Sequence, residues 1–122
     1  MPNTYDPQNI FARILRGEIP NKTVLETAHT LAFHDIHPQA PIHVLVIPKG
    51  PYVTFDHFAA EASAEELLDF HRTTASVVAM VGAAEGGYRA ISNAGVNGMQ
   101  EVPHYHLHIL GGRVLGRLVE RA

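Results

Sequence analysis

The sequence contains no cysteine, which excludes disulfide bonds and thiolate metal ligands and fits a reducing compartment. It contains no apolar run near the roughly 20 residues that a helix needs to cross a bilayer. Residues 1–10 lack the charged and then apolar pattern of a signal peptide. Basic residues are few, since nine Lys and Arg stand against twelve Asp and Glu, and no basic stripe is visible. The sequence therefore predicts a cytoplasmic protein that binds neither membranes nor nucleic acid.

The chain of 122 residues suits one domain with one core, and we expect a single domain over 1–122, with a flexible N-terminus at 1–8 and a tail at 114–122. Strands come in runs around one long helix, which is typical of an α+β fold with a mostly antiparallel sheet of about five strands. A short helix is predicted over 9–16, and a capping box at Ser63–Glu66 begins the long helix, which ends near Gly86-Gly87. Helical spacing predicts that this helix buries Leu67, Phe70, Thr74, Val78 and Val81. The predicted strands cover residues 23–26, 30–35, 42–47, 88–92 and 102–110.

Nine histidines are many for this length, and three of them, His104, His106 and His108, alternate with apolar residues. Successive side chains of a β-strand point to opposite faces, so the three imidazoles are expected on one face and the apolar residues between them in the core. Three other histidines lack such a context and are interpreted as surface residues: His29, His57 and His71.

Three interpretations of this row are open. A single zinc ion does not suit all three rings, because His104 and His108 lie ~13 Å apart on a strand and a zinc–nitrogen bond is only ~2 Å long; two of them with His43 could bind one. A purely structural role explains one histidine better than three in register. Phosphoryl transfer fits best, because a neutral middle imidazole can attack phosphorus while its neighbours donate hydrogen bonds and move protons. This chemistry requires no metal or other cofactor.

The segment 104–110, His-Tyr-His-Leu-His-Ile-Leu, resembles the His-φ-His-φ-His-φ-φ signature of the histidine triad (HIT) superfamily. Further segments are similar in the superfamily's order and cover most of residues 9–113: 10–20, 31–36, 38–41, 43–49, 87–89 and 93–95. Gly111-Gly112-Arg113 and Asn93 resemble the histidine triad nucleotide-binding branch more than the dinucleoside polyphosphate hydrolase branch.

The resemblance implies a HIT-like fold and a homodimer that binds purine nucleotides such as AMP or GMP. It implies cleavage of the P–N bond of nucleoside phosphoramidates or aminoacyl-adenylates through a nucleotidyl-histidine intermediate. The alternatives are a dinucleoside polyphosphate hydrolase, a nucleotide-binding regulatory module with weak activity, and a zinc-binding protein. The dimer contacts are expected on the long helix from Ser63 and on the strand at 88–92.

The same resemblance assigns roles to individual residues. His106 would be the nucleophile, His104 and His108 would bind the α-phosphate, and His108 would protonate the leaving amine. His43 would support the triad by hydrogen bonding, and Asp35 would hold the ribose hydroxyls. Asn93 would contact the phosphate or the leaving group. The apolar slot for the purine would consist of Phe11, Ile14, Phe33 and Ile36.

One position departs from the pattern. Glu101 stands where the superfamily usually has serine or threonine, and a carboxylate beside a phosphate is repulsive. Two explanations are open: Gln100 supplies the missing hydrogen-bond donor, or Glu101 favours a cationic leaving group. Met99 replaces a small glycine and narrows this side of the site, and the tail after Arg113 also differs from the usual ending.

Overall fold

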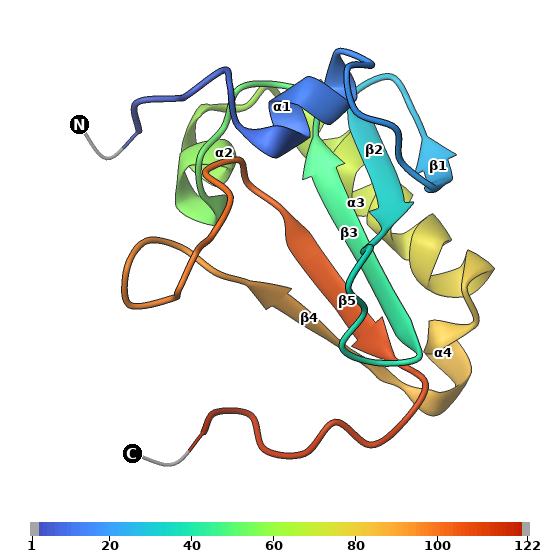
Figure 1. Cartoon of the computed structure of the whole chain (residues 1–122). Coiled ribbons are helices and arrows are strands. Elements are labelled where there is room, and N and C mark those ends of the chain that lie inside the picture. The colour runs from blue at the N-terminus through green and yellow to red at the C-terminus, as the bar shows by residue number, and fades with distance from the viewer. Residues whose placement is uncertain (1–2, 121–122) are drawn as a thin grey trace.

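A computed structural model of the chain describes residues 3–120 (Figure 1). The elements are α1 (Ile10–Leu15), β1 (Thr23–Glu26), β2 (Thr30–His34), β3 (Ile42–Pro48), α2 (Phe55–Glu61), α3 (Ala64–Met80), α4 (Ala83–Gly86), β4 (Tyr88–Ser92) and β5 (Leu107–Gly111). The five strands form one antiparallel sheet in the order β1-β2-β3-β5-β4. The predicted α+β class and five-stranded sheet are confirmed, and α2 and α4 add two short helices to the predicted pair.

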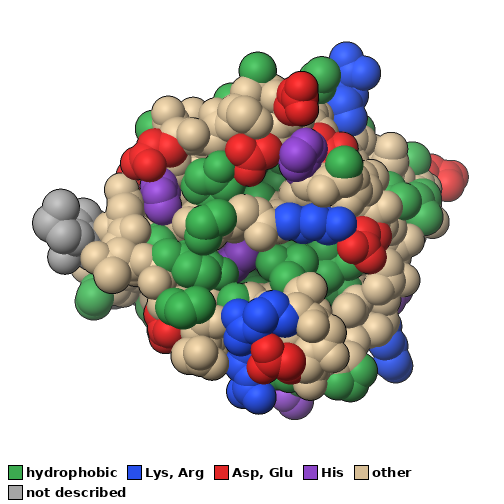
Figure 2. Space-filling model, turned by 90° about the horizontal axis from the view of Figure 1, so that it is seen from above, with side chains coloured by type: hydrophobic (Ala, Val, Ile, Leu, Met, Phe, Trp, Pro, Cys, Tyr) green, Lys and Arg blue, Asp and Glu red, His purple; other side chains and the backbone are tan. Residues whose placement is uncertain are grey.

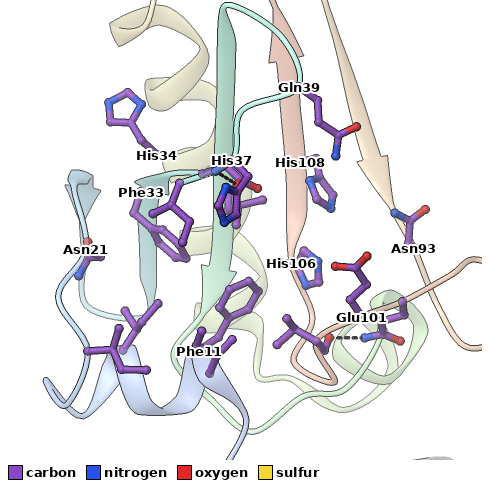
Figure 3. Close-up of a pocket in the computed structure, with 18 of the residues that line it drawn as sticks. Phe11, Asn21, Phe33, His34, His37, Gln39, Asn93, Glu101, His106 and His108 are labelled. Atoms are coloured by element: carbon purple, nitrogen blue, oxygen red, sulfur yellow. Dashed lines mark hydrogen bonds between the residues drawn. The ribbon is translucent and has the colours of Figure 1, made fainter.

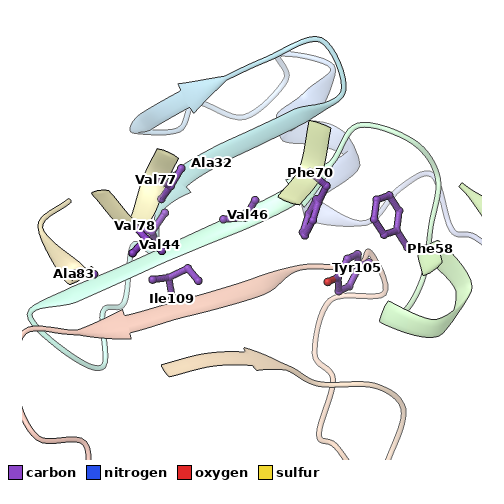
Figure 4. Close-up of a cluster of buried hydrophobic side chains, with 10 residues drawn as sticks. All are labelled: Ala32, Val44, Val46, Phe58, Phe70, Val77, Val78, Ala83, Tyr105 and Ile109. Atoms are coloured by element: carbon purple, nitrogen blue, oxygen red, sulfur yellow. The ribbon is translucent and has the colours of Figure 1, made fainter. Parts of the chain in front are cut away.

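Strand β3 lies in the middle of the sheet and is buried on both faces. Its side chains alternate, so that Val44 and Val46 join the core under α3, whereas Leu45 and Ile47 join the core on the side of α1. All four side chains are at most 4% exposed, as the apolar sequence of this strand requires. The core under α3 consists of Ala32, Val44, Val46, Phe58, Phe70, Val77, Val78, Ala83, Tyr105 and Ile109 (Figure 4).

Helix α3 begins as predicted and ends earlier. The side chains of Ser63 and Glu66 each accept a hydrogen bond from the other's backbone N–H, which confirms the capping box. The helix stops at Met80 because Gly82 takes a left-handed φ of +75°, a common way to end a helix. The buried threonine is Thr73 rather than Thr74, because the Thr73 hydroxyl faces the sheet, 3.1 Å from that of Thr27.

Helix α2 buries a histidine that the sequence places at the surface. His57 is 8% exposed, and its Nδ1 accepts a hydrogen bond from the backbone N–H of Val53. This contact fixes the first turn of α2, which Thr54 also caps. The expected surface position of His57 is therefore wrong, since its ring satisfies a backbone donor that has no helical partner.

Strand β5 begins at Leu107, five residues later than predicted, because the preceding residues turn away from the sheet. Pro103 has no N–H for a ladder, and the N–H of Tyr105 donates to the carbonyl of Tyr52 outside the sheet. His104 and His106 therefore precede the regular strand, and only His108 lies on it. Strand β2 ends at His34, one residue earlier than predicted, so Asp35 lies just after the strand.

The N-terminal end of the described chain contacts the domain, whereas the C-terminal tail is largely exposed. In the stretch 1–8, which the sequence predicts to be flexible, the hydroxyl of Tyr5 meets His104 and the carbonyl of Pro7 accepts from Arg16. The tail runs without helix to residue 120, and Arg89 donates to two of its carbonyls. The predictions for residues 1–2 and 121–122 lie outside the described residues. Within residues 3–120, no helix combines the length and apolar character that crossing a membrane requires.

Candidate active site

A cavity of about 400 Å³ lies between α1, the end of β2, the loop after β4 and the start of β5. Figure 3 shows Phe33 on one side of it, His106 and His108 in the middle, and Asn93 and Glu101 on the other side. The view from the side of α1 in Figure 2 shows apolar side chains gathered around a histidine, with charged side chains about them. Ten of the twelve predicted site residues line this cavity: Phe11, Ile14, Phe33, Asp35, Ile36, Asn93, Gln100, Glu101, His106 and His108. His43 and His104 do not line it.

His106 presents an unprotonated nitrogen. Its Nδ1 lies 2.7 Å from the carbonyl oxygen of His104, which can only accept, so Nδ1 carries the proton and donates. Burial lowers the pKa of His106, so the ring is neutral at pH 7. The lone pair is therefore on Nε2, which makes no hydrogen bond to any described residue. A neutral imidazole held in this tautomer is a competent nucleophile.

His108 has the opposite arrangement to His106, with a proton on Nε2, and a hydrogen bond from His43 determines this arrangement. The backbone N–H of Gln39 donates to Nδ1 of His43, so the neutral His43 ring carries its proton on Nε2. This Nε2 lies 3.0 Å from Nδ1 of His108 and donates to it. Burial lowers the pKa of His43 and, helped by the two neighbouring imidazoles, lowers the pKa of His108 to about 4. The neutral His108 ring therefore carries its proton on Nε2.

His104 is a supporting residue rather than a phosphate ligand. The ring is fully buried, its Nε2 donates to the carbonyl of Pro48 at 2.8 Å, and its Nδ1 accepts from the hydroxyl of Tyr5 at 2.6 Å. Burial lowers its pKa to about 4. Both ring nitrogens are occupied, so the direct phosphate contact that the resemblance implies for His104 does not match the placement of this ring. Its carbonyl orients His106 instead.

Tyr5 is a site residue that sequence reasoning missed. It lies 99 residues from His104 in the chain, and a single tyrosine near a terminus has no periodicity that would reveal its partner. Nine residues of the cavity wall were also not predicted, namely Ile10, Ile19, Pro20, Asn21, His34, His37, Gln39, Leu45 and Val102. Their signal was their position beside the predicted elements rather than any motif.

One end of the cavity is apolar with a carboxylate at its edge. Phe11 and Phe33 meet edge to face, with ring centroids 5.6 Å apart, and Ile36 is 76% exposed at the rim. Asp35 is held in place, because its Oδ1 accepts from the N–H of His37 at 2.8 Å and its Oδ2 lies 3.4 Å from Nε2 of His43. This arrangement offers an apolar slot next to a fixed acceptor.

The other end carries Glu101, and the structure removes Gln100 as a candidate phosphate donor. Both donors of the Gln100 amide are occupied, by the carbonyls of Val53 at 2.7 Å and Val102 at 3.0 Å. Its oxygen accepts from the N–H of Gly95. The explanation that Gln100 supplies the hydrogen-bond donor missing at position 101 is therefore wrong, because both of its amide N–H groups already donate to backbone carbonyls.

Comparisons with known proteins identify the family. The family model described as HIT domain matches residues 16–115. The chain belongs to the HIT family. A 13.2 kDa HIT-like protein of Azospirillum brasilense is 57% identical to it over 121 residues, which is 99% of each chain. The purine nucleoside phosphoramidase of Escherichia coli K12 is 43% identical over 113 residues, 92% of this chain and 93% of its own. The solved HIT family hydrolase from Clostridium thermocellum superposes with a TM-score of 0.83 at 37% identity, covering 93% of this chain and 97% of its own.

A metal ion is an alternative occupant, because Asp35, His43 and His108 offer ligand atoms within 4.8 Å of one another. A relative from Zea mays, 44% identical over 108 residues (88% of this chain and 84% of its own), is named a 14 kDa zinc-binding protein. A metal would need the lone pair on Nε2 of His43, but the N–H of Gln39 holds the ring with its proton there. These residues fit a hydrogen-bonded chain and do not fit a metal ion.

Proposed function

We propose that this HIT-family protein is a purine nucleotide-binding hydrolase that cleaves the P–N bond of nucleoside 5′-phosphoramidates or aminoacyl-adenylates. The observation that carries the proposal is the opposite polarity of two neighbouring rings. His106 offers a lone pair on Nε2, and His108, whose ring centroid is 4.9 Å away, offers a proton on Nε2. Nucleophilic displacement of an amine requires these two groups together. The phosphoramidase of Escherichia coli supports the choice of substrate.

The reaction proceeds in two steps on these residues. The purine lies in the apolar slot lined by Phe11, Phe33 and Ile36, and Asp35 accepts hydrogen bonds from the ribose hydroxyls. Nε2 of His106 then forms a bond to the α-phosphorus while the P–N bond breaks, and the amine leaves with the Nε2 proton of His108. The nucleotidylated ring keeps its Nδ1 proton and is cationic, which offsets the negative charge left on His108.

The second step returns the enzyme to its starting state. Water attacks phosphorus, its proton passes to Nε2 of His108, and the bond from phosphorus to His106 breaks. The products are a nucleoside monophosphate and the free amine. The carbonyl of His104 holds the Nδ1 proton of His106 throughout, so Nε2 keeps its direction during both displacements.

The experiment that tests this function follows the nucleotidyl group. Wild-type protein mixed with α-³²P adenosine phosphoramidate and quenched in base is expected to retain label that acid releases, as a phosphorus–nitrogen bond to imidazole does. His106→Asn is expected to retain no label and to lose turnover while AMP binding stays within about twofold. Turnover by His106→Asn, or none by the wild type on any phosphoramidate, would contradict the proposal. A higher kcat/KM on diadenosine tetraphosphate would favour the dinucleoside polyphosphate hydrolase instead.

We also propose that the protein is a homodimer, for which β4 and α3 offer the surface. Strand β4 is an edge of the sheet, and its unpaired side is open to a second strand. Tyr88 on β4 and Leu68 and Met80 on α3 are each at least 50% exposed. Light scattering at micromolar concentration is expected to give twice the mass of 13.3 kDa, and a monomer would contradict this.

A further inference from the structure

A second hollow of about 500 Å³ adjoins the catalytic cavity at the side of Glu101. Its walls are Gly95, Val96, Met99, Gln100, Glu101 and Pro103. Met99, Gln100 and Glu101 line both spaces, so they form the ridge between them. A substrate whose nucleoside occupies the apolar slot beside Phe33 therefore has room to continue past His106 into this second hollow.

The ridge is rigidly built. A Cβ on Gly98 would lie 2.6 Å from the carbonyl oxygen of Ala94, so the loop closes tightly on itself. Met99 has a φ of +57°, and no other non-glycine residue of the described chain has a positive φ. Gln100 ties the loop to Val53 and Val102. The backbone at Glu101 is therefore held in place by its neighbours, and its exposed side chain extends from it.

Glu101 is the single charged side chain that lines the second hollow, and the phosphate of a nucleotide would lie beside it. It is exposed and forms no ion pair with any residue from 3 to 120. A free carboxylate next to a phosphate raises the energy of the complex of protein and nucleotide unless a cation lies close to the carboxylate. Val96 and Met99, 93% and 80% exposed, add apolar surface next to it.

We propose that Glu101 determines leaving-group specificity, by pairing with a second, positively charged group on the amine that His106 displaces. The substrate class is a nucleoside phosphoramidate of an aliphatic diamine or of another amine with a distal cation, whose methylene chain lies on Val96 and Met99. The inference rests on the proposed function. In the displacement the P–N nitrogen takes its proton from His108 and departs, and the distal ammonium stays paired with Glu101 throughout.

The test compares adenosine 5′-phosphoramidates of three matched amines: 1,5-diaminopentane, pentylamine and 5-aminopentanoic acid. At low salt the wild type is expected to prefer the diamine compound over the pentylamine compound by about threefold in kcat/KM, the size that an exposed charge pair gives. Glu101→Gln is expected to bring this ratio to about one, and Glu101→Lys to shift preference to the carboxylate compound. Because each ratio is taken within one variant, a change in the reactivity of His106 cancels.

Two controls complete the design. Glu85→Gln removes an exposed carboxylate from α4 and is expected to keep the wild-type ratio, and 0.5 M NaCl is expected to abolish the ratio by screening. Equal kcat/KM values for all three amines in the wild type, or an unchanged ratio in Glu101→Gln, would overturn the inference while leaving the proposed hydrolase intact. Failure of the wild type to hydrolyse any of the three would instead overturn the proposed function.

Discussion

Nε2 of His43 lies 3.0 Å from Nδ1 of His108, although 65 residues separate them in the chain. The contact follows from the pairing of β3 with β5, in which His43 is opposite Leu110 and His108 is two residues before it. Diagonal neighbours of this kind lie on one face of a sheet within reach of long side chains. The Gln39 N–H then decides which nitrogen of each ring holds a proton, so a loop backbone sets the polarity of a ring in the candidate active site.

Because of this chain of hydrogen bonds, we expect that metal removal does not change the hydrolytic activity. Dialysis against EDTA is expected to leave kcat on adenosine phosphoramidate unchanged, because His43 presents a proton rather than a lone pair to Asp35 and His108. Metal analysis of the purified protein and a rate assay before and after dialysis measure this. Stoichiometric zinc, together with activity that returns only on adding zinc, would contradict the placement of the protons on His43 and His108.

Replacing Tyr5 by Phe is expected to lower both stability and kcat. The buried Nδ1 of His104 would lose its donor, which costs about 1–2 kcal/mol of unfolding free energy. Movement of His104 would also loosen the carbonyl that orients His106, so kcat is expected to fall with KM unchanged. Tyr52→Phe is the matched control, since its hydroxyl donates to Glu66 and to none of the triad histidines, and it should lower stability alone. An equal effect of both variants on kcat would refute the role of Tyr5.

Replacing Asp35 by Asn is expected to weaken AMP binding about tenfold, because charge-assisted hydrogen bonds to the ribose are lost. Isothermal titration with AMP and with 2′,3′-dideoxy-AMP separates this effect from a general disturbance of the site. The dideoxy nucleotide should bind the variant and the wild type equally. If both nucleotides weaken to the same extent, Asp35 acts only through its contacts with His37 and His43.

Stability is expected to fall when the pH drops from 7 to 5. Burial lowers the pKa of His104 and His108 to about 4 in the folded state, whereas the ordinary value is 6.5. The unfolded chain therefore binds more protons between pH 6.5 and 4, so unfolding becomes more favourable as pH falls through this window. At pH 5, His104 alone lowers the free energy of unfolding by about 2 kcal/mol.

Urea unfolding at the two pH values measures this loss. The variant His71→Gln is the control, because His71 is exposed on α3 and its removal should keep the same dependence on pH. Equal unfolding free energies at pH 5 and pH 7 would show that the triad histidines are not buried in the neutral form.

Local patterns were sufficient for most of the fold. The strands predicted at 42–47 and 88–92 lie close to their observed positions, and the capping box at Ser63–Glu66 marks the observed start of α3. Prediction was wrong where a single hydrogen bond overrides the pattern. The His57 side chain accepts from the N–H of Val53 and is buried, and Tyr105 leaves the ladder to pair with Tyr52, which shortens β5.

The sequence by itself determined the sheet, its buried central strand and the spacing of the three histidines, because these depend on hydrophobic period and residue order. Only the tertiary structure decided what each ring does. Tyr5 and Pro48 occupy both nitrogens of His104, and Gln39 and His43 direct the proton of His108. The physical reason is that a neutral imidazole has one donor and one acceptor, and its partners come from segments far apart in the chain.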